Sequence, residues 1–323
     1  MISLTRSIPI QILIIEALFR RLSPNHRMLP KLREEYNKRK KGLAGENKID
    51  YYLEFLPPNQ FHIFHGLRLI YDNRPFQIDT LLISRKFILL IEVKNISGKL
   101  YFDEVYKQLI WTNDDGDEQV IQDPLEQVKR QSRQFVKWIG SHHNIPIEHL
   151  VVIGNPRTYI DPKSGPVYRN HILHAHALEE KVQEISSNYQ TDLLSHKAFK
   201  QLTTQILNSH NPLAIDPQKT YQYSSSDIIK GIQCPKCEKF EMKRVQQKWA
   251  CPHCKSASRN AHKQTILDYL LLIKPSITNR ECRDFLKISS ASTAHHLLMS
   301  MGLSFTGSNK SRKYFIGKDK VVD

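Results

Sequence analysis

Two apolar segments separated by a very short turn place the strongest constraint on how this 323-residue chain can fold. Residues 77–83 and 87–95 are rich in branched apolar side chains, which indicates two buried strands joined as a hairpin. Asp79 lies just inside the first segment, and Glu92 and Lys94 lie near the end of the second. Glu92 and Lys94 are two residues apart, so they point to the same face of a strand. Because an unpaired charge is costly to bury, these side chains need a partner, and a divalent cation suits two carboxylates.

An ordinary ion pair on a solvated strand face would also account for the charges of the second segment. Two flanking patterns favour a functional site instead. Upstream, residues 42–46 (Gly-Leu-Ala-Gly-Glu) open a helical pattern. Downstream, Asp123 and Pro124 form a helix-start signal. Gln127 and Gln131 follow it, one turn apart on one helix face.

The order of these elements resembles the NERD (nuclease-related) domain of the PD-(D/E)xK nuclease-like superfamily. The similar stretch covers residues 38–155, and it departs from the family pattern at Ile78, which stands where a proline is usual. The resemblance implies an α/β fold with a restriction-endonuclease-like mixed sheet flanked by helices. It also implies a divalent-metal phosphodiesterase site. The residues that the resemblance makes catalytic are Glu46, Asp79, Glu92, Lys94 and Gln127.

The residue types suit that chemistry. Mg²⁺ held by Asp79 and Glu92 would polarise a phosphate and lower the pKa of bound water. Lys94 would position the nucleophile or neutralise developing negative charge. Gln127 would orient a group or contact the nucleic-acid backbone, and Gln131 is expected to bind nucleic acid as well. Hard oxygen ligands favour Mg²⁺ or Mn²⁺ over zinc at this site.

Four of the five cysteines form two Cys-x-x-Cys pairs with 13 residues between them. Two such pairs are typical of a structural zinc site, in which four thiolates complete a tetrahedron. Disulfide pairing is the alternative, and it is disfavoured because we find no secretory signal. The spacing resembles a zinc ribbon at residues 230–258. The expected ligands of the structural Zn²⁺ are Cys234, Cys237, Cys251 and Cys254.

The positive charge of the chain is concentrated towards its C-terminus. The net charge is +15, and residues 230–320 hold 18 Lys and Arg against 6 Asp and Glu. The first 229 residues are nearly balanced, with 29 against 25. A basic block of this kind is typical of a nucleic-acid-binding module, although an anionic membrane would attract it too. We expect DNA as the partner, with RNA as the alternative, and a second copy of the chain or other DNA-processing proteins as further partners.

Residues 259–323 indicate helix, turn and helix, followed by two strands around a polar turn. Thr278 and Glu281 have the spacing of a capping box at the start of one helix. The order resembles a small winged-helix-like domain. A helical domain for protein contacts is the alternative, because the presumed recognition helix has no Arg or Lys. The residues expected to contact nucleic acid are Ser292, Thr293, His295, Lys310, Arg312 and Lys313.

Residues 1–37 form an apolar and basic N-terminal segment with helical character. Its apolar run at residues 8–19 is too short to cross a bilayer and is interrupted by Gln11 and Glu16. We expect this run to form a helix packed on the nuclease-like domain, while a peripheral membrane anchor stays open.

After the N-terminal segment, the sequence predicts four further segments. They are the nuclease-like domain (38–208), a linker (209–229), the zinc ribbon (230–258) and the winged-helix-like domain (259–323).

The expected function is a divalent-metal-dependent nuclease that acts on DNA, and the alternative is a non-catalytic DNA-binding or regulatory protein. A cytoplasmic location follows from the resemblance and from the reduced cysteines.

Overall fold

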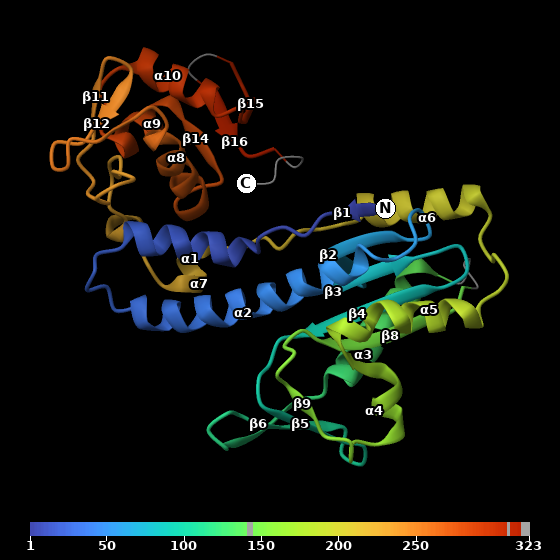
Figure 1. Ribbon diagram of the computed structural model, residues 1–323. Coiled ribbons are helices and arrows are strands. Elements are labelled where there is room, and N and C mark those ends of the chain that lie inside the picture. Colours follow the sequence, from blue (N-terminus) through green and yellow to red (C-terminus); the bar gives the residue numbers. More distant parts are fainter. Residues whose placement is uncertain (141–144, 309–310, 318–323) are drawn as a thin grey trace. The chain divides into compact units, whose positions relative to one another are not determined.

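The computed structural model describes residues 1–140, 145–308 and 311–317. The chain divides into two compact units, each assembled from two separate stretches (Figure 1). Unit 1 comprises Met1–Ser7 and Lys38–Leu213, and unit 2 comprises Ile8–Asn37 and Ala214–Asp323. The chain passes from unit 2 back to unit 1 within helix α2 (Leu29–Leu53). The segment expected as 1–37 is therefore divided between the two units.

Unit 1 is built on a six-stranded mixed sheet. Its three central strands, β2, β3 and β4, are antiparallel. β1 pairs parallel with β2 at one edge, and β8 and β10 continue parallel to β4 at the other. In their order across the sheet, the strands are β1 (Ile2–Leu4), β2 (His62–Tyr71), β3 (Arg74–Ile83), β4 (Ile88–Lys94), β8 (Ile147–Ile153) and β10 (Ile172–His174).

Helices cover both faces of this sheet. Alternate residues of β4 enter different hydrophobic clusters, with Ile88 and Leu90 on one face and Leu89 and Ile91 on the other. Helix α3 (Pro124–Ile139) packs on the first face, together with α6 (His196–Asn208). The C-terminal half of α2 and helix α5 (Leu178–Asn188) pack on the second. The mixed α/β fold expected from the sequence is thereby confirmed.

A smaller, four-stranded sheet leads from β4 into α3. Its strand order is β7-β6-β5-β9. Leu100 and Phe102 of β5 and Leu109 of β6 join the same cluster as α3, so the small sheet extends that side of the core. The remaining elements of unit 1 are β5 (Lys99–Asp103), β6 (Gln108–Thr112), β7 (Glu118–Gln122), β9 (Tyr159–Ile160), α4 (Pro166–His171) and the 3-10 helix η1 (Ala175–Ala177).

Unit 2 combines helices with two three-stranded sheets. One sheet has the order β11-β12-β13, and the other has the order β14-β16-β15. The helices are α1 (Ile10–Arg21), α7 (Pro217–Tyr221), η2 (Ser225–Asp227), α8 (Ala261–Leu272), α9 (Asn279–Leu286) and α10 (Ala291–Ser300). The strands are β11 (Lys243–Val245), β12 (Lys248–Ala250), β13 (Ala257–Ser258), β14 (Ser276–Thr278), β15 (Ser304–Thr306) and β16 (Lys313–Phe315).

Helix α1 belongs to unit 2, which corrects the expectation that it packs on the nuclease-like domain. Its apolar side chains enter the same core as α8. The fully buried Arg21 pairs through Nε with Asp268 Oδ2 of α8 at 2.7 Å, and its Nη1 donates to the carbonyl of Gly231 at 2.7 Å. The Asp268 carboxylate also accepts from Arg20 at 2.8 Å. A buried arginine needs such partners, and they lie in the C-terminal half of the chain.

Part of the expected linker is also packed structure. Tyr221, Tyr223 and Ile228 are buried in the core of unit 2. The hydroxyl of Tyr223 donates to the carbonyl of Leu272 at 2.7 Å. Among the helices of the described residues, none combines the length and apolarity that crossing a membrane requires.

Candidate active site

Asp79 and Glu92 lie beside each other on neighbouring strands. The β3–β4 ladder pairs Thr80 with Ile91, so Asp79 and Glu92 are the next residues along each strand. The backbone N–H of Val93 donates to Asp79 Oδ2 at 3.0 Å. Glu92 is buried, with 2% of its surface exposed. The hairpin therefore brings two carboxylates to the same place, as the sequence predicts.

Lys94 and helix α3 hold the Glu92 carboxylate from two sides. Lys94 Nζ donates to Glu92 Oε1 at 2.7 Å and to Gln127 Oε1 at 3.0 Å. Gln127 Nε2 donates to Glu92 Oε1 at 2.7 Å. Gln131 Nε2 donates to Glu92 Oε2 at 3.0 Å. The two glutamines one turn apart thus fix both oxygens of one carboxylate.

The start of α3 explains why these glutamines face β4. Asp123 is the N-cap, and its Oδ1 accepts from the N–H of Leu125 at 2.7 Å. Pro124 occupies the first turn, where its missing N–H costs nothing. The hydroxyl of Tyr168 donates to Asp123 Oδ2 at 2.6 Å, which fixes the cap to α4.

Gln131 is buried beside Glu92. We expected it to contact nucleic acid, yet only 7% of its surface is exposed. Its amide nitrogen bonds Glu92, and its Oε1 is buried with no hydrogen-bond partner among the described residues. The geometry supports a role in orienting Glu92.

Glu46 reaches the same region from α2, because the helix approaches the sheet closely at Gly45. A Cβ added to Gly45 would lie 2.4 Å from Cβ of Asn95, and one added to Gly154 would lie 3.1 Å from Cα of Gly45. Gly42 has open space around it. Within the Gly-x-x-Gly-Glu pattern, it is therefore the second glycine that brings Glu46 towards the site.

The negative charges of the Asp79, Glu92 and Glu46 carboxylates repel one another. Burial, with the negative charges of Glu92 and Glu46, raises the pKa of Asp79 well above its ordinary value. Burial also raises the pKa of Glu46, against the opposing effect of Arg6, which pairs with it. A cluster of neighbouring carboxylates is stabilised when it binds protons or cations.

Arg6, Asp50, His65 and Thr80 also belong to this region, and the sequence analysis did not identify them. Arg6 Nε pairs with Asp50 Oδ2 at 2.7 Å, and Nη2 contacts His65 Nδ1 at 2.9 Å and Thr80 Oγ1 at 3.0 Å. The four-residue spacing of Glu46 and Asp50 was the available signal, since it places two acids on one helix face.

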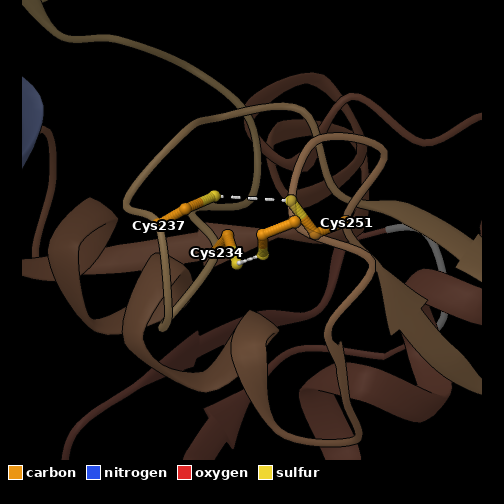
Figure 2. A group of neighbouring side chains, drawn as sticks. Cys234, Cys237 and Cys251 are labelled. Atoms are coloured by element: carbon orange, nitrogen blue, oxygen red, sulfur yellow. Dashed lines mark hydrogen bonds between the residues drawn. The ribbon is translucent and has the colours of Figure 1, made fainter.

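The four cysteines of unit 2 come together as predicted. Their sulfur atoms all lie within 4.8 Å of one another (Figure 2). The Cys234–Cys254 sulfurs are 3.6 Å apart, and the Cys237–Cys251 sulfurs are 3.5 Å apart. A tetrahedral ion with Zn–S bonds of about 2.3 Å would separate its sulfurs by about 3.8 Å. The donor set and spacing therefore fit a structural zinc ion.

The ribbon hairpin that joins the two cysteine pairs is formed by β11 and β12. Gln246 and Gln247 at its tip have φ values of 45° and 63°, as a tight two-residue turn requires. Elsewhere in unit 2, Cys282 is fully buried in α9, and burial raises its pKa to about 12. That thiol packs as a small apolar group, as expected from the sequence.

The described residues of unit 2 that were expected to contact nucleic acid lie on α10 and at the start of β16. Ser292 and His295 are exposed, and Thr293 is half-buried. Lys313 is exposed on β16, while Arg312 lies 4.5 Å from the ring centre of Phe305. Lys310 lies outside the described residues.

These features define an α/β protein with a charged cluster at the ends of neighbouring strands, joined to a four-cysteine unit. Residues 41–154, about a third of the chain, match the family model of the nuclease-related domain (NERD). This match confirms, for residues 41–154, the resemblance to the nuclease-related domain seen in the sequence. No curated protein and no solved structure matches the chain.

Proposed function

We propose that the protein is a divalent-metal-dependent nuclease that acts on DNA. The observation that carries the proposal is the convergence of Asp79, Glu92 and Lys94 in unit 1. Two neighbouring carboxylates would repel a phosphate group unless a cation lay between them. Burial, and then the negative charges of Glu92 and Glu46, raise the pKa of Asp79 well above its ordinary value, which supports a place that would be stabilised by a bound cation.

Asp79 and Glu92 are the residues that would hold Mg²⁺ or Mn²⁺. Asp79 Oδ2 accepts from Val93, whereas Oδ1 accepts no hydrogen bond from the described residues. Glu92 Oε2 accepts one hydrogen bond, from Gln131, and so keeps a lone pair for a metal. Carboxylate oxygens are the ligands that these ions prefer. When bound, the ion would supply Lewis acidity and lower the pKa of a coordinated water.

Lys94 would provide the fixed positive charge of the reaction. Its ammonium group is held by Glu92 and Gln127, and 26% of the side chain is exposed. A lysine held in this way can orient an attacking water and stabilise the negative charge that develops on the phosphate. Gln127 and Gln131 would keep Glu92 in place while that charge develops.

Unit 2 would bring nucleic acid to this centre through a zinc ribbon and a winged-helix-like segment. The order α8-β14-α9-α10-β15-β16 supports the second part of this proposal. α10 itself has no Arg or Lys. A hollow beside α9 supplies the missing charge, since Arg280, Arg283 and Lys287 line it. The only acid in its lining, Asp284, is paired with Lys230 at 2.7 Å.

Cleavage assays with the purified full-length protein test the nuclease proposal. Linear, circular and single-stranded DNA, and RNA, are incubated with Mg²⁺, Mn²⁺ or EDTA. We expect cleavage to require the metal and to fall at least about 100-fold in Asp79→Asn and in Lys94→Ala. Asp192→Asn is the control, because Asp192 pairs with Arg85 at 2.8 Å and is not part of the cluster.

Cleavage that persists in EDTA, or in both site variants, would contradict the proposal. Tight DNA binding without cleavage under every condition would instead favour a DNA-binding or regulatory protein.

A further inference from the structure

Arg6 belongs to unit 1, although in the sequence it lies well before residues 41–154, which match the NERD model. Strand β1 pairs parallel with β2, and the N-terminal amine donates to the carbonyl of Phe61 at 2.6 Å. Just after β1, the side chain of Arg6 pairs with the acidic side chains Glu46 and Asp50 of α2. Only 7% of its side chain is exposed.

Two carboxylates of α2 bind the Arg6 guanidinium. Nε and Nη2 donate to the two oxygens of Asp50 at 2.7 and 2.8 Å, which is a bidentate pair. Nη1 pairs with Glu46 Oε2. Glu46 and Asp50 are four residues apart and so reach the same cation from one helix face.

The sheet supplies the remaining acceptors. Nη2 donates to Thr80 Oγ1 at 3.0 Å and lies 2.9 Å from His65 Nδ1, and Nη1 lies 3.5 Å from the carbonyl oxygen of Asp79. Burial lowers the pKa of His65 to about 4, which favours its neutral imidazole, and its Nδ1 also lies 3.3 Å from Asp50 Oδ1. The fork of the guanidinium is thus surrounded by acceptors on both sides.

Several of these acceptors are chemical groups that commonly bind metal ions in proteins: two carboxylates, an imidazole nitrogen and a main-chain carbonyl. These acceptor atoms are spread around the planar guanidinium group of Arg6 and do not form a compact cluster. Among the residues that the structure describes, the four cysteines are the one group of three or more His, Cys, Asp or Glu residues whose ligand atoms all lie within 4.8 Å of one another. The guanidinium therefore stands where a second divalent ion would otherwise find its ligands.

We propose that Arg6 is the resident cation of the active site and takes the place of a second metal ion. Glu46 and Asp50 are committed to Arg6, so the centre binds one divalent ion, at Asp79 and Glu92. Glu46 is then a positioning residue that acts through Arg6 and is not a metal ligand. This inference rests on the proposed nuclease function, because it assigns the charges of the same site.

Mn²⁺ binding to the full-length, zinc-loaded protein tests this inference without a cleavage assay. Isothermal titration calorimetry gives the number of ions and the Kd, and electron paramagnetic resonance counts bound Mn²⁺ independently. The variants are Arg6→Ser, which removes the cation, and Arg6→Lys, which keeps its charge without its fork. Arg85→Ser is the control, since Arg85 is a paired arginine of the same unit that bonds Asp192 and the carbonyl of Leu194.

We expect one Mn²⁺ per chain in the wild type, in Arg6→Lys and in Arg85→Ser. Arg6→Ser should take up a second Mn²⁺ or bind the single ion about tenfold tighter, because a unit positive charge near the ion is gone. Thermal melts show whether each variant is folded.

An Arg6→Ser protein that binds one ion with unchanged or weaker affinity would overturn the inference. Two ions in the wild type or in Arg6→Lys would overturn it as well, even if Arg6→Ser did not fold. No Mn²⁺ binding by the wild type would be a different result, because it would overturn the nuclease proposal on which this one depends.

Discussion

At the scale of single residues, two glycines of one motif have opposite surroundings. Gly45 is in contact with Asn95 and Gly154, whereas Gly42 has nothing within 4 Å of the position that a Cβ would take. Both lie inside helix α2, where glycine is less favourable than alanine by about 1 kcal/mol. The same substitution should therefore have opposite effects at the two positions.

Gly45→Ala should destabilise the protein, and Gly42→Ala should stabilise it. At Gly45 the added Cβ would lie 2.4 Å from Asn95 Cβ, and overpacking of this kind costs about 1–3 kcal/mol. At Gly42 the gain should approach 1 kcal/mol. Urea unfolding of the two variants beside the wild type measures both changes. Equal effects at the two positions would contradict the close approach of α2 to β4.

At the scale of elements, α9 carries the positive charge that α10 lacks. Arg283 is half-buried, and its Nη1 donates to the carbonyl of Ser289 at 3.3 Å. Arg280 and Lys287 are exposed beside it. Arg280 and Arg283 share one face of α9, opposite the buried Cys282 and Phe285, and Lys287 is the C-cap residue that follows the helix.

A triple variant, Arg280→Ala with Arg283→Ala and Lys287→Ala, should weaken DNA binding by roughly 10- to 100-fold at low salt. The slope of log K against log salt should fall by about 2 to 3, because up to three phosphate contacts are lost. Fluorescence anisotropy across a salt series measures both quantities. The charge-matched control replaces Lys137, Lys197 and Lys200, exposed lysines of α3 and α6. An equal loss in this control would show that only net charge matters.

Elements with local signals could be predicted from the sequence. The β3–β4 hairpin follows from its branched apolar residues, α3 from the Asp123 cap, and α9 from the capping box of Thr278 and Glu281. These signals lie within a few residues of the element they define. The place of α1 could not be predicted, because Arg21 finds Asp268 247 residues later in the chain.

In the candidate site, too, only residues that lie in local sequence patterns could be predicted. Asp79, Glu92, Lys94 and the face of α3 were predicted, since each lies on a periodic element or in a recognisable motif. Arg6 was not, because its partner Asp50 is 44 residues away and no local pattern marks the arginine. The orientation of Gln131 towards Glu92 could not be predicted either, because helical periodicity gives its face but not its partner.

At the scale of the whole molecule, one half-buried and one buried histidine should make the free energy of unfolding depend on pH. Burial lowers the pKa of His149 in unit 1 and of His262 in unit 2 to about 4. Trp249 Nε1 donates to His262 Nδ1 at 3.2 Å, a bond that needs the unprotonated nitrogen. Each histidine takes up a proton more readily when the chain is unfolded, where its pKa is about 6.5.

Stability should therefore fall as the pH drops from about 6.5 towards 4. Near pH 5.5 each histidine should contribute about 1.4 kcal/mol of this loss. Urea unfolding at a series of pH values measures it. His149→Gln should reduce the pH dependence of unit 1, whereas the exposed His296→Gln should leave it unchanged. A pH profile that is the same for both variants would contradict this assignment.

The alternation of the chain between two units has a consequence for how the protein is made. Unit 2 begins with α1 but cannot bury it until α8 has been synthesised. The ribosome adds about 5–20 residues per second, so the 247 residues from Arg21 to Asp268 correspond to roughly 12 to 50 s. During that time α1, an apolar helix, lacks its packing partner α8 on the nascent chain, while the segments of unit 1 emerge from the ribosome after it. Synthesis rate and chaperone capture should therefore influence the yield of this protein more than that of a chain whose domains follow one another in sequence.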